Sequence, residues 1–106
     1  MKIITRQELC RKMTNDEPFS LVEVLPTECY EDAHLPGAIN IPLGEEFEAL
    51  ARQALPDKGR EIVTYGSDEN GSASPMAAKR LEQLGYERVM YYEFGKLDWK
   101  QAGSGL

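Results

Sequence analysis

The stretch Glu61-Ile62-Val63-Thr64-Tyr65 decides the fold class, because it reads as a short β-strand that opens directly into a polar loop and a helix. The loop covers residues 66–74, and we predict that Ser74 caps a helix whose first residue is Pro75. Gly85 would end that helix. The apolar stripe of the helix would pack on the strand and consists of Ala77, Ala78, Leu81 and Leu84. A strand, a loop and a covering helix form the repeating unit of an α/β domain.

The same alternation continues on both sides of this stretch. Thr5 and Glu8 have the spacing of a capping box, which predicts the start of a helix there. We predict further strands at residues 2–4, 21–25, 38–41 and 88–91, and further helices or helical turns at residues 6–13, 28–33, 45–54 and 95–100. This order predicts an α/β domain with a mostly parallel sheet.

Length and composition predict one domain over residues 1–106. The chain has 106 residues, of which 42% are hydrophobic and 28% are charged. A chain of this size buries enough apolar surface to fold without the support of a metal or a disulfide. We expect the last residues, 101–106, to form a frayed tail.

The charge balance argues against two classes of partner. Twelve Lys and Arg residues against eighteen Asp and Glu residues give a formal charge of -6. An acidic protein is repelled by the phosphates of nucleic acids and by anionic membranes, so we expect neither as a partner. No stretch is long and apolar enough for a membrane span, and the first residues do not read as a secretory signal. The expected location is the cytoplasm.

The cysteine and histidine content gives no indication of a metal site. The chain has two cysteines, Cys10 and Cys29, and one histidine, His34. Without a CxxC pair or a second histidine, we expect no zinc site and no other metal or cofactor. Both cysteines are expected as reduced thiols. Cys10 falls on the apolar stripe of the first helix, whereas Cys29 follows the strand at residues 21–25.

Four motifs carry a resemblance to one family. They are residues 21–25 followed by Tyr30, the string His34-Leu35-Pro36-Gly37-Ala38-Ile39-Asn40-Ile41-Pro42, the strand, loop and helix of residues 62–86, and the pair Gly95 and Trp99. The sequence resembles a single-domain member of the rhodanese-like (sulfurtransferase homology) family over residues 21–99. The resemblance implies a rhodanese-like α/β fold, with a mostly parallel central sheet of about five strands and helices on both faces.

The departures from the family pattern concern its chemistry. In active members a cysteine directly follows the strand and carries sulfur as a persulfide, but this sequence has Gly66 there. A second loop cysteine of some members corresponds to Gly71. The loop has no basic residue and instead carries Asp68 and Glu69. Because glycine has no side chain, position 66 cannot be the nucleophile of sulfur transfer. The phosphatase branch of the fold, which needs the same cysteine and an arginine, is excluded with it.

Three functions remain open at this point. The first is a catalytically inactive module that binds a protein partner through the loop; the second is a sulfurtransferase that uses a relocated thiol, either Cys29 or one from a partner chain. The third is a sensor in which backbone N–H groups of the loop hold a small anion without covalent chemistry. The candidate binding residues are Gly66, Ser67, Asp68, Glu69, Asn70, Gly71, Ser72, Ala73 and Ser74.

Two polar residues outside the loop have structural interpretations. Glu23 lies within a strand predicted to be buried, so we expect it to pair with a backbone group or a basic side chain. His34 is expected to hydrogen-bond the turn that it begins. The sequence does not indicate an oligomeric state.

Overall fold

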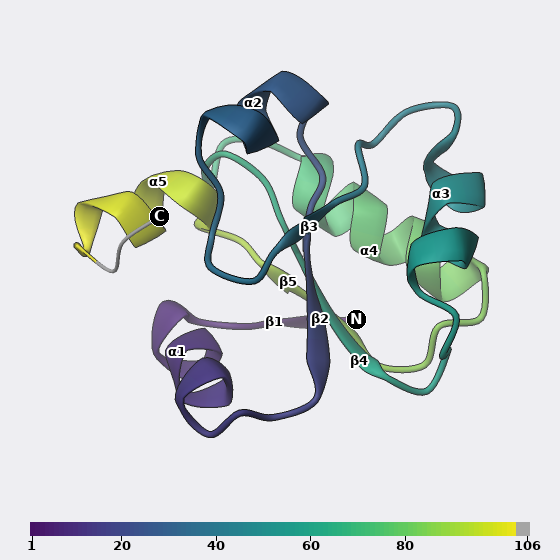
Figure 1. Ribbon diagram of the computed structural model, residues 1–106, viewed down its shortest axis with the longest axis horizontal. Coiled ribbons are helices and arrows are strands. Elements are labelled where there is room, and N and C mark those ends of the chain that lie inside the picture. Colours follow the sequence, from purple (N-terminus) through teal and green to yellow (C-terminus); the bar gives the residue numbers. More distant parts are fainter. Residues whose placement is uncertain (104–106) are drawn as a thin grey trace.

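The computed structural model describes residues 1–103 and contains a parallel sheet with the strand order β1-β5-β4-β2-β3 (Figure 1). The strands are β1 (Lys2–Ile3), β2 (Phe19–Glu23), β3 (Ile39–Asn40), β4 (Glu61–Tyr65) and β5 (Val89–Tyr92). The helices are α1 (Arg6–Thr14), α2 (Thr27–Asp32), α3 (Phe47–Ala54), α4 (Ala73–Gln83) and α5 (Gly95–Gln101). The predicted α/β fold with a five-stranded sheet is confirmed.

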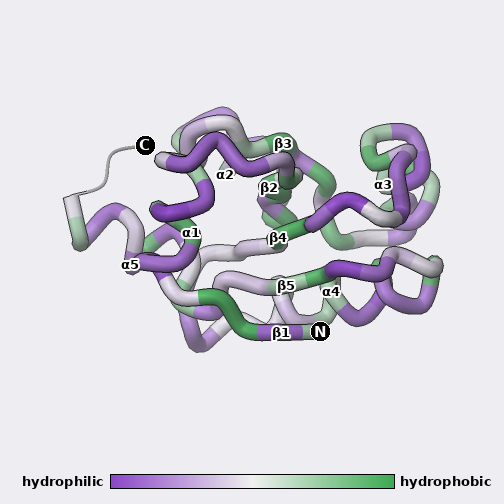
Figure 2. Tube along the Cα trace, turned by 90° about the horizontal axis from the view of Figure 1, so that it is seen from below, coloured by the Kyte–Doolittle hydropathy of each residue, from purple (hydrophilic) through white to green (hydrophobic). Residues whose placement is uncertain are grey.

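Helices cover both faces of the sheet, and Figure 2 shows α1 and α5 on one side of the strands and α3 and α4 on the other. One core layer joins α3 and α4 to the sheet through Phe47, Ala51, Ala78 and Leu81, together with Val22 and Ile62 of the strands. The other joins α1 and α5 to it through Leu9 and Trp99, together with Leu21, Val63 and Tyr65. The central strands β2 and β4 are therefore covered on both faces, which explains the apolar residues at successive positions such as Leu21-Val22 and Ile62-Val63.

Register in the centre of the sheet places three polar residues side by side. β2 pairs with β4 so that Glu23 lies beside Tyr65, and it pairs with β3 so that Glu23 also lies beside Asn40. All three residues end their strands at the carboxyl edge. In an open parallel sheet, this edge is where binding sites form.

Most element positions agree with the sequence-based predictions. β4 has the predicted bounds, and Thr5 and Glu8 form the predicted capping box at the start of α1. β2 begins and ends two residues before the predicted strand, which leaves Leu25 beyond its end. Gly85 follows α4 with φ of +98°, a conformation that favours glycine, so the predicted end of this helix is confirmed.

The predicted start of α4 is wrong. The helix begins at Ala73, its N-cap is Ser72, and no side chain caps it. Ser74 lies inside the first turn, is buried, and accepts a hydrogen bond from Thr64 Oγ1 at its carbonyl (2.9 Å). Proline is tolerated throughout a first helical turn because the N–H groups there have no partner within the helix, so Pro75 did not mark the first residue.

The carboxyl-terminal prediction is only partly covered by the structure. Gln101 is the last residue of α5, and residues 104–106 of the predicted frayed tail lie outside the described residues. Within the part that is described, no helix has the length and apolar character needed to span a membrane. Cys10 is half-buried, Cys29 is exposed, and both are free thiols.

Candidate functional site

The candidate loop crosses the carboxyl edge of the sheet between β4 and α4. Gly66 directly follows β4 and is buried. The start of α5 holds the loop, because Lys96 N–H donates to the Gly66 carbonyl (2.9 Å) and Leu97 N–H donates to the Ser67 carbonyl (2.8 Å). Two helices on opposite faces of the sheet therefore meet at this loop.

Gly95 allows this close approach. Its φ is +65°, and a Cβ atom at this position would lie 2.6 Å from the Gly66 carbonyl oxygen and 2.9 Å from the Ser67 carbonyl carbon. Both atoms belong to the backbone, so neither can turn away as a flexible side chain could. Only glycine fits the contact between α5 and the loop.

Position 66, by contrast, has room for a side chain. A Cβ atom there would lie 3.8 Å from Ala73 Cβ, 3.9 Å from Leu25 Cδ2 and 3.9 Å from Ser74 N, which are ordinary contacts. The first turn of α4 would therefore adjoin any group at this position. A helix amino terminus favours negative charge, so a thiol placed here would be favoured as a thiolate.

Asp68 accepts hydrogen bonds from two backbone N–H groups inside the loop. Its carboxylate oxygen Oδ1 accepts the Asn70 N–H (2.9 Å), and its carbonyl accepts the Gly71 N–H (3.2 Å). Pro75 has no N–H to offer in the first turn of α4. The cradle of N–H groups that we expected for an anion thus has two of its donors already satisfied by Asp68.

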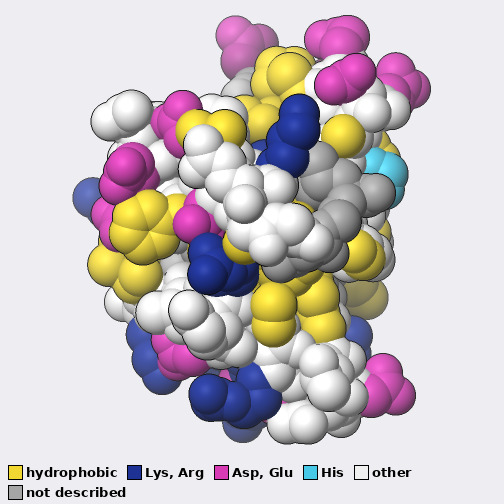
Figure 3. Space-filling view, turned by 90° about the vertical axis from the view of Figure 1, so that its left-hand side faces the viewer, with side chains coloured by type: hydrophobic (Ala, Val, Ile, Leu, Met, Phe, Trp, Pro, Cys, Tyr) yellow, Lys and Arg dark blue, Asp and Glu magenta, His cyan; other side chains and the backbone are white. Residues whose placement is uncertain are grey.

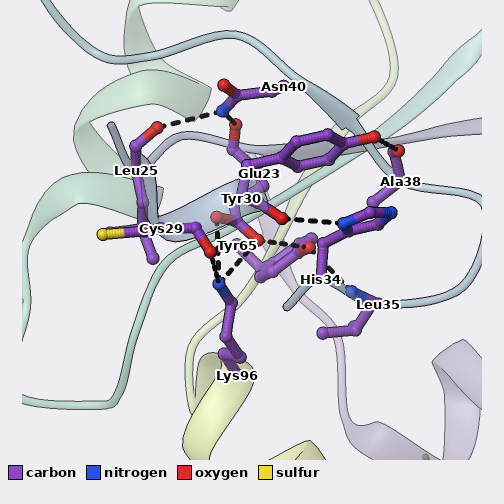
Figure 4. Close-up of polar contacts among 10 residues, drawn as sticks. All are labelled: Glu23, Leu25, Cys29, Tyr30, His34, Leu35, Ala38, Asn40, Tyr65 and Lys96. Carbon is purple, nitrogen blue, oxygen red and sulfur yellow. Dashed lines mark hydrogen bonds and ion pairs between the residues drawn. The ribbon is translucent and has the colours of Figure 1, made fainter. Parts of the chain in front are cut away.

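A buried polar cluster lies beside the loop (Figure 4). Glu23 is fully buried and its carboxylate accepts hydrogen bonds from the Tyr65 hydroxyl (2.8 Å) and from Lys96 Nζ (3.0 Å). The Tyr65 hydroxyl also accepts the Leu35 N–H (3.1 Å). Burial, and to a smaller extent the Glu23 carboxylate, raises the pKa of Tyr65 far above its usual range, so Tyr65 is a neutral donor. The prediction that Glu23 pairs with a basic group is confirmed.

Lys96 connects this cluster to α2. In addition to Glu23, its Nζ donates to the Cys29 carbonyl at 3.0 Å. The exposed sulfur of Cys29 points away from Lys96 and Glu23 in Figure 4. The basic group therefore meets the backbone of Cys29 rather than the thiol.

His34 has a structural contact. Its Nδ1–H donates to the Tyr30 carbonyl at 2.8 Å, and its ring stacks on the Tyr30 ring with centroids 3.9 Å apart. We had expected His34 to bond the turn that it begins, but its hydrogen bond is made to α2 instead. The Tyr30 hydroxyl in turn donates to the Ala38 carbonyl (2.6 Å), which fixes α2 against the segment that leads into β3.

Sequence reasoning missed two residues of this region. Lys96 was not singled out, and no spacing in the chain links it to Glu23, which lies 73 positions away. Asn40 Nδ2 donates to the carbonyls of Glu23 (3.0 Å) and Leu25 (2.9 Å) and so fixes the end of β2. Asn40 lies inside the motif at residues 34–42, and this position could have marked it as a structural residue of the sheet edge.

Comparison with known proteins assigns the family. A family model for the rhodanese-like domain matches residues 5–102. The chain belongs to the rhodanese-like domain family. Its free cysteines, Cys10 on α1 and Cys29 on α2, both lie outside the loop that follows β4.

Relatives of this rhodanese-like domain include a transcriptional regulator and proteins of sulfur transfer. The HTH-type transcriptional regulator Rv0324 of Mycobacterium tuberculosis is 38% identical over 94% of this chain and 42% of its own length. The putative sulfur carrier protein YrkF of Bacillus subtilis is 31% identical over 91% of this chain and 49% of its own length. Thiosulfate sulfurtransferase PspE of Escherichia coli is 38% identical over 64% of this chain and 62% of its own length. The chain thus spans less than two thirds of each of these relatives.

Solved structures agree with the fold. The solution structure of the rhodanese-like domain from the Anabaena protein Alr3790 has a TM-score of 0.84 and 27% identity, covering 97% of this chain and 76% of that one. The crystal structure of a thiosulfate sulfurtransferase from Pseudomonas aeruginosa has a TM-score of 0.85 and 25% identity, and the match covers 97% of this chain and 19% of that one. The rhodanese-like fold class predicted from the motifs is confirmed.

Proposed function

We propose that this rhodanese-like domain is a non-catalytic binding or regulatory module that acts through the loop of residues 66–74. The observation that carries the proposal is Gly66, which lies between the end of β4 and the first turn of α4 and has no side chain. Covalent sulfur transfer needs a nucleophile, and the backbone at this position supplies none. The room for a Cβ atom there shows that glycine is not enforced by crowding.

The charges of the loop also disfavour an anionic sulfur donor such as thiosulfate. Asp68 and Glu69 are carboxylates in the loop, whereas the nearby ammonium of Lys96 is bound to Glu23. Each like-charge approach at ~4 Å costs about 1 kcal/mol even in high dielectric. The same carboxylates would favour a basic partner.

The similarity to a transcriptional regulator supports the regulatory form of this proposal. This chain matches 42% of the Mycobacterium tuberculosis protein, so a domain of this kind occurs there as part of a regulator. The similarity to a putative sulfur carrier and to a thiosulfate sulfurtransferase supports a second candidate, sulfur transfer on a relocated thiol. Cys29 favours that candidate because it is exposed and its carbonyl contacts Lys96, whose backbone holds Gly66.

A thiosulfate-to-cyanide sulfur-transfer assay on the intact chain separates the two candidates. The expected result is thiocyanate formation at the uncatalysed rate, with the same rate for Cys29→Ser. Turnover that disappears in Cys29→Ser would overturn the non-catalytic proposal in favour of a relocated thiol.

A further inference from the structure

Three exposed apolar side chains adjoin the loop of residues 66–74. Met76 in α4 is 51% exposed, and Phe94 and Leu97 at the start of α5 are 41% and 46% exposed. Met76 N–H donates to the Ser72 carbonyl (3.1 Å) and Leu97 N–H donates to the Ser67 carbonyl (2.8 Å), so both residues directly border the loop. Phe94 is the N-cap residue of α5 in the right-handed helical conformation, and Leu97 lies three positions later, the spacing of neighbouring side chains on a helix. Since α4 and α5 cover opposite faces of the sheet, the three residues come from elements on both sides of the loop.

The charged residues around these apolar groups are carboxylates, apart from Lys96, whose ammonium is bound to the buried Glu23. Asp68 and Glu69 belong to the loop, and Glu93 directly precedes Phe94. The nearest unpaired lysines on these two helices, Lys79 and Lys100, lie one turn farther along α4 and α5. The border of the loop therefore combines apolar contact area with negative charge.

One face of the molecule shows a partial separation of charge. In Figure 3 acidic side chains gather at the top and along the left margin, where hydrophobic side chains lie among them, whereas Lys and Arg lie at the bottom and also near the centre. α2 contributes Glu28, Glu31 and Asp32 and contains no basic residue. The hydrogen bond from Lys96 to the Cys29 carbonyl joins α2 to α5, so this acidic helix adjoins the same edge of the sheet.

We propose that Met76, Phe94, Leu97, Asp68, Glu69 and Glu93 form a docking surface for a basic amphipathic segment of another protein. This inference rests on the proposed function and names the chemistry of the partner. Apolar side chains of the segment cover the three exposed apolar groups, and its Lys or Arg residues pair with the carboxylates around them. The net charge of -6 opposes nucleic acid and anionic lipid as occupants of the same surface.

Titration with defined peptides tests this surface. The probe is an amphipathic helical peptide of Leu and Lys, about 18 residues or five turns long. One control peptide has Glu in place of each Lys, and another has Gln in place of each Leu. We expect only the first peptide to bind at about 0.1 M salt, with amide NMR shifts confined to residues 66–76 and 93–98, and to bind more weakly as salt is added.

Variants of the protein separate this surface from general attraction to an acidic chain. Phe94→Ser combined with Leu97→Ser is expected to weaken binding by about tenfold, as the loss of apolar anchors does in interfaces. Glu69→Lys tests the charge without changing an apolar residue and is also expected to weaken binding. The matched control is Met1→Ser combined with Ile3→Ser, which removes exposed apolar groups from β1 and the residue before it and is expected to change nothing.

Three results would overturn the docking proposal: equal binding of all peptides, amide shifts that map elsewhere, or equal weakening by the control pair. Self-association that the Phe94 and Leu97 changes abolish would also overturn it, because the occupant would then be a second copy of this chain. None of these results bears on sulfur transfer. Thiocyanate formation by the unmodified chain would instead overturn the proposed function, whatever the peptides do.

Discussion

At the scale of single residues, the proposed function implies that the backbone around Gly66 could still hold a cysteine thiol at this position, where the resemblance to active family members places one. The space for a Cβ atom next to Ala73 and Ser74 N makes this testable. We predict that Gly66→Cys folds and that the introduced thiol has a pKa below the ~8.5 of a free cysteine, because the amino terminus of α4 favours the thiolate. Absorbance of the thiolate during a pH titration, with Cys10 and Cys29 changed to Ser, measures this pKa.

Asp68 and Glu69 oppose this lowering. Adding Asp68→Asn and Glu69→Gln to Gly66→Cys is therefore expected to lower the pKa of the introduced thiol further and to give weak sulfur transfer. A thiol that titrates at or above the free value in this triple variant would show that the loop does not present the start of α4 to position 66.

A second prediction concerns the pair of Glu23 and Lys96. Lys96→Met leaves the fully buried Glu23 carboxylate with the Tyr65 hydroxyl as its remaining side-chain donor. We expect a loss of about 3–5 kcal/mol in the free energy of unfolding, measured with denaturant, because an unpaired buried charge is costly. The matched control, Lys96→Met combined with Glu23→Gln, is expected to recover part of that loss. A loss as large in the double variant as in the single one would contradict the pairing.

These residues also show how far the sequence alone can reach. The absence of a nucleophile at position 66 was predicted from the resemblance to the rhodanese-like family, which implies a cysteine directly after this strand in active members where this sequence has Gly66. The partner of Glu23 does not follow from local pattern, since Lys96 reaches it only after α5 docks on the sheet. The hydrogen bonds from Asp68 to Asn70 and Gly71 likewise depend on the loop conformation, which composition does not specify.

At the scale of elements, the docking of α5 against the loop gives a further prediction. Gly95→Ala places a Cβ atom 2.6 Å from the Gly66 carbonyl oxygen, so the helix and the loop have to move apart. Gly37→Ala is the matched control, because Gly37 has a similarly positive φ (+78°) and no atom within 4 Å of the added Cβ. We expect Gly37→Ala to cost about 1–2 kcal/mol and Gly95→Ala roughly 1–3 kcal/mol more, measured by chemical unfolding. Equal costs would mean that the contact is not close.

The packing of α4 gives a prediction of its own. Leu81 is fully buried in the layer between α4 and the sheet, so Leu81→Ala is expected to lower the free energy of unfolding by about 2–5 kcal/mol. Met76→Ala in the same helix is the control, because Met76 is 51% exposed and its truncation should have little effect. A denaturant midpoint that Leu81→Ala leaves unchanged would show that α4 does not dock through this face.

The sequence predicted the elements better than their ends. Hydrophobic periodicity marks the residues that face the core, and this pattern located each helix and strand in the correct order. Ends depend on weaker local contacts. The helix α4 starts at Ala73, with Ser72 as its N-cap. Ser72 and Ser74 are both residues of a type that commonly caps helices, so the sequence alone does not distinguish a start at Ala73 from a start at Pro75.

At the scale of the whole molecule, the sheet brings the ends of β2, β3 and β4 to one edge and places α2, α5 and the loop beside them. The motifs predicted this rhodanese-like arrangement, since each corresponds to an element that the fold needs. The structure has this rhodanese-like framework, with Gly66 directly after β4. The proposed non-catalytic function rests on that residue, which has no side chain.

The intact mass of the protein after incubation with thiosulfate is the most direct test of this central claim. We expect an unchanged mass, because Gly66 offers no sulfur atom and neither Cys10 nor Cys29 lies in the loop that follows β4. Peptide mapping of the same sample checks both cysteines. A mass increase of one sulfur atom on Cys29, which cyanide then removes as thiocyanate, would contradict the account.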